Sequence, residues 1–459
     1  MANDDLVWFL TAPSERIFIR RGDPLGFRWA ADRYADILVP GLSSRTYDAR
    51  WLTILSWVLV QANEAWRRYD RCAGSPQSHE HAMRLYGWIR PLELMWVARA
   101  LALESREVLQ GKLRQLPNRR AVEGWLQNPS RPRFGLTESQ FRRYRALGPY
   151  GAYRTVFRHI PGLTVAGDGW TPDVLAHELA ALVDGPLSID EGAPTSRGKP
   201  PTPERYWPRA WTRWRTPGAG ALTPEPLQPL RPIGATEGRL IRSVLFEGEN
   251  AQAKIRRRVA KLCAGGPGQH LALCKQVVAG TAGMLPPEAA SWVRHLPSYS
   301  AFADAAIEAV RAVWSIVGNE DNPPRLGLAA VAKSDLVVDA LEELVKPADA
   351  WARHACFSPE FAPALALAKG LGRRAGSTER LKSLIRHHLT YGGGRRWFSL
   401  DGSDVIREAP PASAPAAYYR FRLWTVARLA HQCRLTSGLP AILRADRESE
   451  TDEGEDDAT

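Results

Sequence analysis

The sequence has no long apolar run, few cysteines and no complete catalytic motif, and each absence excludes a class of protein. No segment approaches the roughly 20 apolar residues that a membrane-spanning helix requires. Acids at Asp4 and Asp5 stand where an export signal would have its basic start, so we expect a cytoplasmic protein with no membrane partner. The five cysteines, an odd number in 459 residues, argue against a disulfide framework. We expect reduced, mostly buried thiols.

Three strings resemble cofactor or metal motifs and fail at a required position. Residues 192–200 resemble a phosphate-binding loop, but five residues separate its glycines and proline stands where the magnesium-binding Ser or Thr belongs. His177–Ala181 begins like a zinc-protease helix, but alanine replaces the second ligand. Cys263, His270 and Cys274 lack paired short ligand loops and an evident fourth ligand. The sequence therefore predicts no metal and no cofactor.

Lysine is scarce as well, and arginine supplies most of the positive charge, with 52 arginines against 9 lysines. The formal net charge is +12, but residues 446–459 carry −7, so residues 1–445 carry +19. A body this basic requires a polyanion, an acidic protein partner or its own tail for compensation. The planar guanidinium group fits phosphate oxygens, which favours DNA or RNA, although a GC-rich genome alone also enriches arginine. We expect the acidic tail to be disordered and to lie over the basic surface when nucleic acid is absent.

Helical periodicity dominates the apolar pattern and predicts a mainly α-helical protein of two lobes. Residues 1–185 are the expected N-terminal helical domain, and residues 236–445 are the C-terminal one. Between them, residues 186–235 hold eleven of the 35 prolines and are predicted to be a Pro/Trp/Arg-rich linker or arm. Its aromatic and arginine side chains could stack bases, or could simply pin the arm onto a neighbouring domain.

Apolar spacing predicts individual helices over 50–71 and over 83–115, the second broken near Pro91. A capping box predicts a helix that begins near Glu138, and Pro172 predicts another from Thr171 onward. The tryptophans within the first two helical patterns are expected in the core: Trp51, Trp57, Trp88 and Trp96. Further helices are predicted over 250–264, 287–296, 302–317, 336–345 and 359–371.

Two places predict strands. Residues 396–400 and 404–407 flank Asp401-Gly402, which is a strong hairpin signal, and Arg16–Arg21 is a weaker strand pattern. With helices over 359–371 and 378–389 before it, the hairpin resembles the wing of a winged helix. The basic residues that would then face nucleic acid are Arg373, Arg374, Arg380, Lys382, Arg386, Arg395 and Arg396. The alternative is a solvated basic helix followed by an ordinary hairpin packed on the core.

Two further segments offer basic surfaces. The helix over 250–264 places Lys254, Arg257, Arg258 and Lys261 along one side and apolar residues on the other, so it could present cations to phosphates. Residues 133–154 are a third candidate, in which Arg142 and Arg143 accompany further arginines and several tyrosines. The helix over 250–264 could equally be an ordinary solvated face.

One pair has a catalytic interpretation. Six residues separate Arg380 from His387, as in the loose Arg-x(4–6)-His pattern of HEPN-type ribonucleases, which cleave RNA without a metal. Leu381 stands where those enzymes commonly have a polar residue. A metal-independent nuclease is one alternative function, and a protein-interaction scaffold that uses the tryptophans and the arm is another.

Residues 25–59, 133–154, 167–172 and 392–398 resemble uncharacterised helical bacterial proteins encoded near anti-phage defence or DNA-processing genes. The resemblance implies no activity and no catalytic residue; it implies a bacterial component that works beside other proteins. We therefore expect a non-catalytic subunit that binds DNA or RNA within a multi-subunit defence or DNA-processing assembly.

Overall fold

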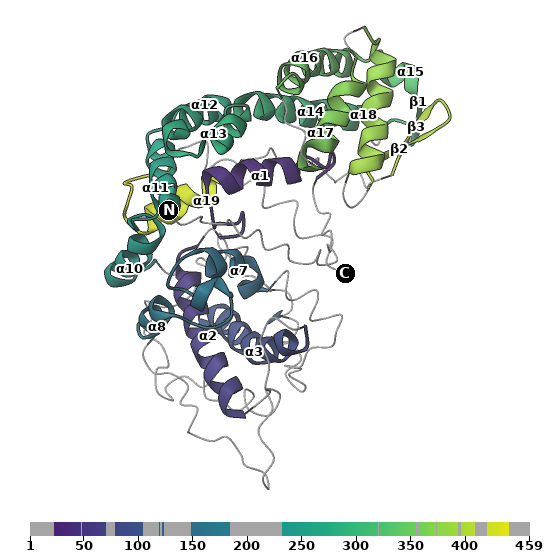
Figure 1. Cartoon of the computed structure of the whole chain (residues 1–459). Helices are drawn as coiled ribbons and strands as arrows, with labels where there is room; N and C mark the ends of the chain where they lie inside the picture. Colours follow the sequence, from purple (N-terminus) through teal and green to yellow (C-terminus); the bar gives the residue numbers. More distant parts are fainter. Residues whose placement is uncertain are drawn as a thin grey trace. The chain divides into compact units, whose positions relative to one another are not determined.

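The structure is a computed structural model (Figure 1). It describes residues 23–46, 48–69, 79–103, 119, 122–123, 148–183, 232–319, 321–354, 359–372, 374–392, 396–408 and 420–439. The predicted strand at Arg16–Arg21, the helix start near Glu138, the acidic tail and nearly all of the connector lie outside these residues.

Contacts divide the described residues into two compact units, each built from segments far apart in the sequence. Unit 1 takes those within Met1–Ala31 and His295–Tyr419, and unit 2 takes those within Asp32–Arg294 and Arg420–Ala445. These borders differ from the composition-based ones at 186 and 236. Because the connector itself falls almost wholly outside the described residues, it stays a prediction.

Both units are mainly helical, which confirms the predicted fold class. The border between the units falls inside α1 (Arg28–Leu38). The other helices of unit 2 are α2 (Arg50–Tyr69), α3 (His79–Leu103), α7 (Pro149–His159), η2 (Val165–Gly167), α8 (Val174–Ala180), α10 (Ala235–Leu245), α11 (Ala251–Ala264), α12 (His270–Thr281), η4 (Ala282–Met284), α13 (Pro287–Val293) and α19 (Leu423–Gln432).

The core of unit 2 has α2 at its centre, with α3, α7 and α8 packed against it. Trp51, Trp57, Trp88 and Trp96 are all buried, as predicted. Trp57 and Trp96 meet edge to face, with ring centroids 5.8 Å apart, an arrangement that aromatic pairs favour. In the same unit α11 packs on α10, α12 and α19, and α10 also contacts α8.

Two helix boundaries differ from the prediction. The helix α3 runs through Pro91 without a break, because the neighbouring residues Ile89 and Leu92 are fully buried and their packing outweighs the hydrogen bond that proline cannot donate. The helix α8 begins at Val174 instead of Thr171. Asp173 caps it by accepting the Val174 N–H at 2.8 Å, and this cap takes precedence over the proline signal.

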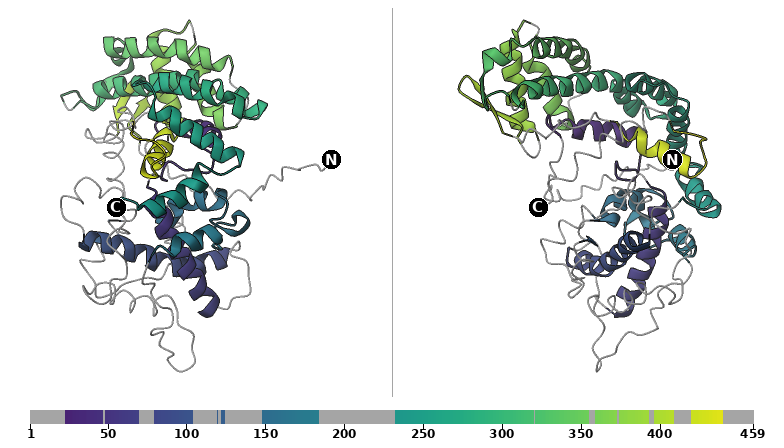
Figure 2. Two further views of the ribbon diagram at one scale, coloured as in Figure 1. Left: turned by 90° about the vertical axis from the view of Figure 1, so that its left-hand side faces the viewer. Right: turned by 180° about the vertical axis from the view of Figure 1, so that it is seen from behind.

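Unit 1 places α14 beside α16 (Figure 2), and α16 in turn packs on α17 and α18. Its elements are α14 (Leu296–Val317), β1 (Arg325–Gly327), α15 (Leu328–Val331), α16 (Asp335–Ala352), η5 (Pro359–Phe361), α17 (Ala362–Gly370), α18 (Ser377–Tyr391), β2 (Phe398–Asp401) and β3 (Asp404–Arg407). The predicted helix over 287–296 is divided between α13 and the start of α14.

The predicted hairpin is confirmed as β2 and β3, which pair antiparallel with Asp401 opposite Asp404. Gly402, in the turn, has a positive φ of 60°, which glycine adopts without steric cost. The sequence did not predict β1, whose three residues add to the free edge of β3 and complete an antiparallel sheet of order β1-β3-β2. The structure does not confirm the winged helix, and the hairpin is one part of this sheet, beside α14, α15 and α18.

Candidate nucleic-acid interface

The helix α11 forms where the sequence predicted it and separates apolar from basic residues. The Asn250 side chain caps it by accepting the Ala253 N–H at 2.7 Å, which satisfies one of the unpaired donors of the first turn. Ala253, Val259 and Cys263 are fully buried on the side that meets the rest of unit 2. The opposite side is exposed.

All four predicted cations of α11, Lys254, Arg257, Arg258 and Lys261, lie on that exposed side. Lys254 pairs with Glu249 at 3.2 Å, an exposed contact of little energetic value. Arg258 donates from Nε to the Gly280 carbonyl at 3.1 Å, at the end of α12. Within the described residues Arg257 and Lys261 make no ion pair, so this cationic face of α11 keeps most of its positive charge uncompensated.

The first arginine of the run Arg256–Arg258 behaves differently. Arg256 is fully buried, and it donates from Nε to the Leu245 carbonyl at 2.7 Å and from Nη1 to the Pro40 carbonyl at 2.8 Å. Burial lowers the pKa of its guanidinium to about 10, so the group remains charged near neutral pH. The sequence could have predicted that Arg256 is buried, because its spacing places it on the same side of the helix as Ala253, Ala260 and Cys263.

The helix α18 presents a less continuous basic surface. Arg386 is exposed, whereas Arg380 and Lys382 are partly buried. Arg374 before the helix and Arg396 after it are exposed, and the predicted Arg373 and Arg395 lie outside the described residues.

Two buried histidines occupy the inner side of α18. His387 donates from Nε2 to the Leu25 carbonyl at 2.8 Å, and burial lowers its pKa to about 4. His388 donates from Nδ1 to the Pro24 carbonyl at 2.8 Å and accepts the Trp397 N–H at Nε2. Both rings hold residues 24–25 against the helix, which argues against His387 as half of a catalytic pair with Arg380.

The third basic segment is only partly described, because Arg142 and Arg143 lie outside the described residues. Tyr150 and Tyr153, two of the tyrosines of this candidate segment, are buried. Tyr153 donates its hydroxyl to the Asp48 carbonyl at 2.8 Å, and Arg154 stacks on Trp170 with 4.6 Å between the guanidinium and the ring. The two tyrosines belong to the core of unit 2, because the amphipathic α7 places its aromatic residues against α2 and α3, whereas Arg154 is only partly buried.

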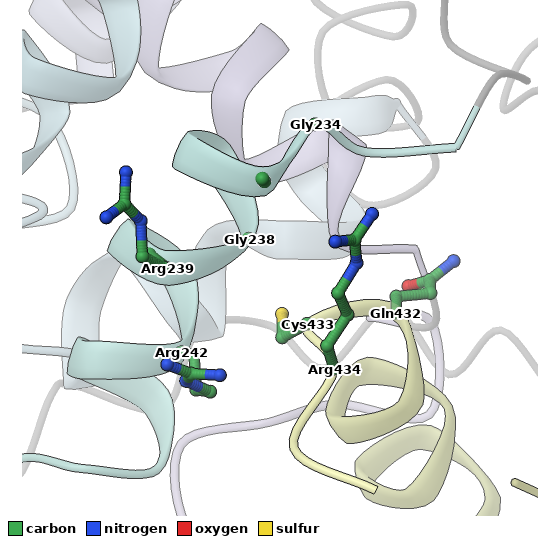
Figure 3. A pocket seen from close by; sticks show the side chains of 8 residues that line it. Gly234, Gly238, Arg239, Arg242, Gln432, Cys433 and Arg434 are labelled. Atoms are coloured by element: carbon green, nitrogen blue, oxygen red, sulfur yellow. The ribbon is translucent and has the colours of Figure 1, made fainter. Parts of the chain in front are cut away.

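A pocket that the sequence did not predict lies in unit 2, where the start of α10 meets the end of α19 (Figure 3). Its volume is about 220 Å³. The residues that line it are Gly234, Ala235, Gly238, Arg239, Arg242, Gln432, Cys433 and Arg434. The three-residue spacing of Arg239 and Arg242 could have placed them on one face of a helix, but nothing local in the sequence connects them with Arg434.

The pocket has an excess of positive charge. Arg242 pairs with Glu247 at 3.1 Å, and Arg239 makes a long hydrogen bond of 3.4 Å to the Thr236 hydroxyl. Arg434 has no ion-pair partner among the residues that the structure describes, and its side chain is exposed. Burial raises the pKa of the Cys433 thiol, which therefore lines the pocket as a neutral group.

A buried polar network lies directly behind this pocket. Arg50, the first residue of α2, pairs from Nε with Glu237 at 3.0 Å and donates to the Pro232 carbonyl at 2.6 Å. Burial raises the pKa of the Glu237 carboxyl, and the Arg50 charge partly offsets this shift. Gln432 accepts the Ala49 N–H at 2.9 Å and donates to Asp48 at 3.4 Å. One short stretch of chain, residues 48–50, thus anchors both walls of the pocket.

The rejected metal motifs are placed as follows. His177 and Glu178 are exposed on α8. The Cys274 sulfur lies 3.5 Å from His270 Nε2, and burial raises the pKa of the nearby Cys263 thiol. Within the described ranges no group of three or more His, Cys, Asp or Glu side chains could hold a metal ion.

No helix in the described part of the chain combines the length and apolarity needed to cross a membrane. Comparison of the chain with protein-family models, with curated proteins and with solved structures finds no match. The interpretation of the cationic face and of the pocket therefore depends on their geometry and charge.

Proposed function

We propose that the protein binds DNA or RNA without acting on it, through the cationic face of α11. The observation that carries the proposal is the exposure of Lys254, Arg257, Arg258 and Lys261 on one side of a helix whose other side is buried. Nucleic acid is the partner best matched to such a face, because phosphates present a dense row of single negative charges. The net charge of +12 adds a long-range attraction.

The spacing of the four cations suits contact with a phosphate backbone. Residues 254 and 261 are separated by two helical turns, which corresponds to about 10 Å along the axis. The long side chains extend this reach, so the face could contact phosphates of neighbouring nucleotides without entering a groove. Such contacts carry no base specificity, and we expect binding that tolerates many sequences.

The wider biological role rests on sequence reasoning. A bacterial, cytoplasmic assembly for defence or DNA processing follows from the resemblance and the composition described above, and protein partners follow from the same resemblance. The burial of His387 favours the non-catalytic role over the nuclease.

The first experiment measures the affinity of the full chain for double-stranded DNA, single-stranded DNA and RNA across a salt series. In Arg257→Glu/Lys261→Glu, we expect the affinity at low salt to fall at least tenfold. The slope of log affinity against log salt should become shallower by about 2, because two phosphate contacts are lost.

The matched control is Lys333→Glu/Lys346→Glu, which changes the net charge by the same amount at two exposed lysines of unit 1. We expect this variant to lose less than threefold in affinity. An equal loss in both variants would mean that overall charge drives binding and would overturn the assignment to α11. A wild-type chain that binds none of the three nucleic acids would overturn the proposal and make the cationic face a docking surface for an acidic protein.

A further inference from the structure

The pocket at the start of α10 concentrates positive charge from two elements that are far apart in the sequence. Arg239 and Arg242 project from α10, and Arg434 follows the end of α19 (Figure 3). In Figure 3 the Arg434 side chain extends from the end of α19 toward the start of α10. All three arginines contribute to the lining of one small cavity, although in Figure 3 the Arg239 guanidinium is directed away from that of Arg434.

The carboxylates near the pocket compensate only Arg242. Glu237, in the first turn of α10, is turned inward and buried against Arg50. Glu247 follows the end of α10 and pairs with Arg242. Among the described residues, Arg239 and Arg434 therefore lack an acidic partner.

The backbone adds to the positive character of the cavity. Gly234 caps α10, and the N–H groups of the first turn carry partial positive charge. A Cβ atom at Gly234 would meet no atom within 4 Å, so this side of the pocket is open to an approaching group. At Gly238 a Cβ would lie 3.8 Å from the Cys433 Cα, which shows how closely the two walls approach.

The walls are held in place before any ligand arrives. The buried Arg50–Glu237 pair fixes the start of α10, and the contacts of Gln432 with Asp48 and Ala49 fix the end of α19. Removing one partner of a buried pair is costly, so the arrangement of the walls is well defined. Binding to a preformed site loses less free energy to the ordering of side chains.

We propose that this pocket binds a phosphate monoester, the group found at the end of a nucleic-acid strand and on a free nucleotide. A monoester carries about −1.5 to −2 charge and three strong acceptor oxygens, compared with −1 for a phosphate within a strand. Arginine forks pair with such oxygens in a bidentate manner. That the monoester belongs to a nucleic-acid strand rests on the proposed function, whereas the binding of a phosphate monoester by the pocket does not depend on it.

The size of the cavity supports a terminal group. Its 220 Å³ is below the roughly 300–1,000 Å³ of pockets that enclose drug-sized ligands. It can take a phosphate with part of its sugar, whereas a duplex or a continuous strand would have to pass over it. The cationic face of α11 is available for the strand itself.

The test compares one single-stranded oligonucleotide carrying a 5′-phosphate, a 3′-phosphate or hydroxyls at both ends, together with 5′-AMP and inorganic phosphate. We expect the wild-type chain to bind at least one phosphorylated form about fivefold or more tightly than the hydroxyl form at low salt. In Arg239→Gln/Arg434→Asn this preference should disappear. Asparagine is chosen because Arg434 has a φ of 57°, a conformation that asparagine tolerates.

Two further variants separate the pocket from the cationic face. Lys333→Glu/Lys346→Glu should keep the preference for a phosphorylated end. Arg257→Glu/Lys261→Glu should lower the affinity for all three oligonucleotides by the same factor, so that the ratios of these affinities stay unchanged. Thermal unfolding of each variant shows whether the fold is retained, and Arg434→Lys, which keeps a cation, should preserve part of the preference.

Each outcome decides between the two proposals. Equal affinity for all three oligonucleotides, with no binding of 5′-AMP or phosphate, would overturn the pocket as a monoester site while leaving nucleic-acid binding intact. Binding of 5′-AMP without any oligonucleotide binding would support the pocket with a free nucleotide as its source, and would overturn the proposed function. A preference that persists in Arg239→Gln/Arg434→Asn would place monoester recognition elsewhere and overturn the inference.

Discussion

The helices α11 and α18 have the same basic, amphipathic sequence character, yet they differ in what they expose. The four predicted cations of α11 are all exposed, whereas in α18 Arg386 is exposed and Arg380 and Lys382 are partly buried. The inner side of α18 also carries two histidines that hydrogen-bond carbonyls of residues 24–25. Both helices are packed: α18 is contacted by α15, α16, α17 and β2, and α11 by α10, α12 and α19. A basic amphipathic pattern therefore gives a continuous exposed cationic face only when the packing leaves the basic side of the helix free.

The largest effect should come from the one arginine of α11 that does not belong to its exposed face. We expect Arg256→Ala to lower the free energy of unfolding by about 2–4 kcal/mol, because the Leu245 and Pro40 carbonyls lose their donors and a cavity remains. The matched variant Arg257→Ala should stay within about 0.5 kcal/mol of the wild type. Urea unfolding measures both, and similar values for the two variants would contradict the assignment of Arg256 to the core.

The stability of unit 1 should depend on pH because α18 carries buried histidines, whereas α11 contains no histidine and should contribute no such dependence. The folded pKa of His387, about 4, lies below the ordinary value of 6.5, so between these values the unfolded chain binds more protons. Stability contributed by this residue is therefore complete above about pH 6.5 and is lost as the pH falls toward 4. The loss is about 3 kcal/mol at most. Burial of His388 acts in the same direction, and Asp23 opposes the shift of His387.

Urea unfolding at pH 7 and at pH 5 measures this dependence, and His387→Gln is the informative variant. Glutamine keeps an amide donor for the Leu25 carbonyl but does not titrate in this range. We expect a smaller difference in stability between the two pH values in the variant than in the wild type. An unchanged difference would show that other groups cause the acid sensitivity.

The smallest effect should be that of Arg386→Glu on nucleic-acid binding. Since Arg386 is the one exposed cation among the described residues of α18, we expect a loss in affinity of less than about threefold. Arg257→Glu, tested in the same assay, should weaken binding by about three- to tenfold, because charged phosphate contacts are individually worth on the order of 1 kcal/mol. A loss from Arg386→Glu as large as that from Arg257→Glu would extend the binding surface to α18 and remove the contrast between the two helices.

Features that depend on neighbouring residues in the chain were predictable. The hairpin around Asp401-Gly402, the cap of α11 at Asn250 and the burial of Trp57 and Trp96 all follow local patterns. The predicted start of α8 at Thr171 was wrong because two local signals competed: Pro172 favoured an earlier start, but the Asp173 side chain provided the cap. The predicted break of α3 near Pro91 was wrong because packing on α2 outweighed a local helix breaker.

The candidate site was predictable only in part. The cationic face of α11 follows from the helical period, and even the inward position of Arg256 could have been derived from the stripe that it shares with Ala260. The inward position of the α18 histidines could not have been derived from the sequence. Their hydrogen-bond partners are the carbonyls of residues 24 and 25, and nothing in the sequence relates this segment to α18.

The sequence by itself determined the mainly helical fold class, the position of most helices and the excess of arginine, because these depend on composition and on contacts within a few residues. The tertiary structure alone decided that Arg50 is buried against Glu237 and that Arg380 and Lys382 of α18 are partly buried. It also decided that Arg239, Arg242 and Arg434 line one pocket. The physical reason is that burial and charge clustering depend on how distant segments pack, and a one-dimensional pattern of apolar and basic residues is compatible with many such packings.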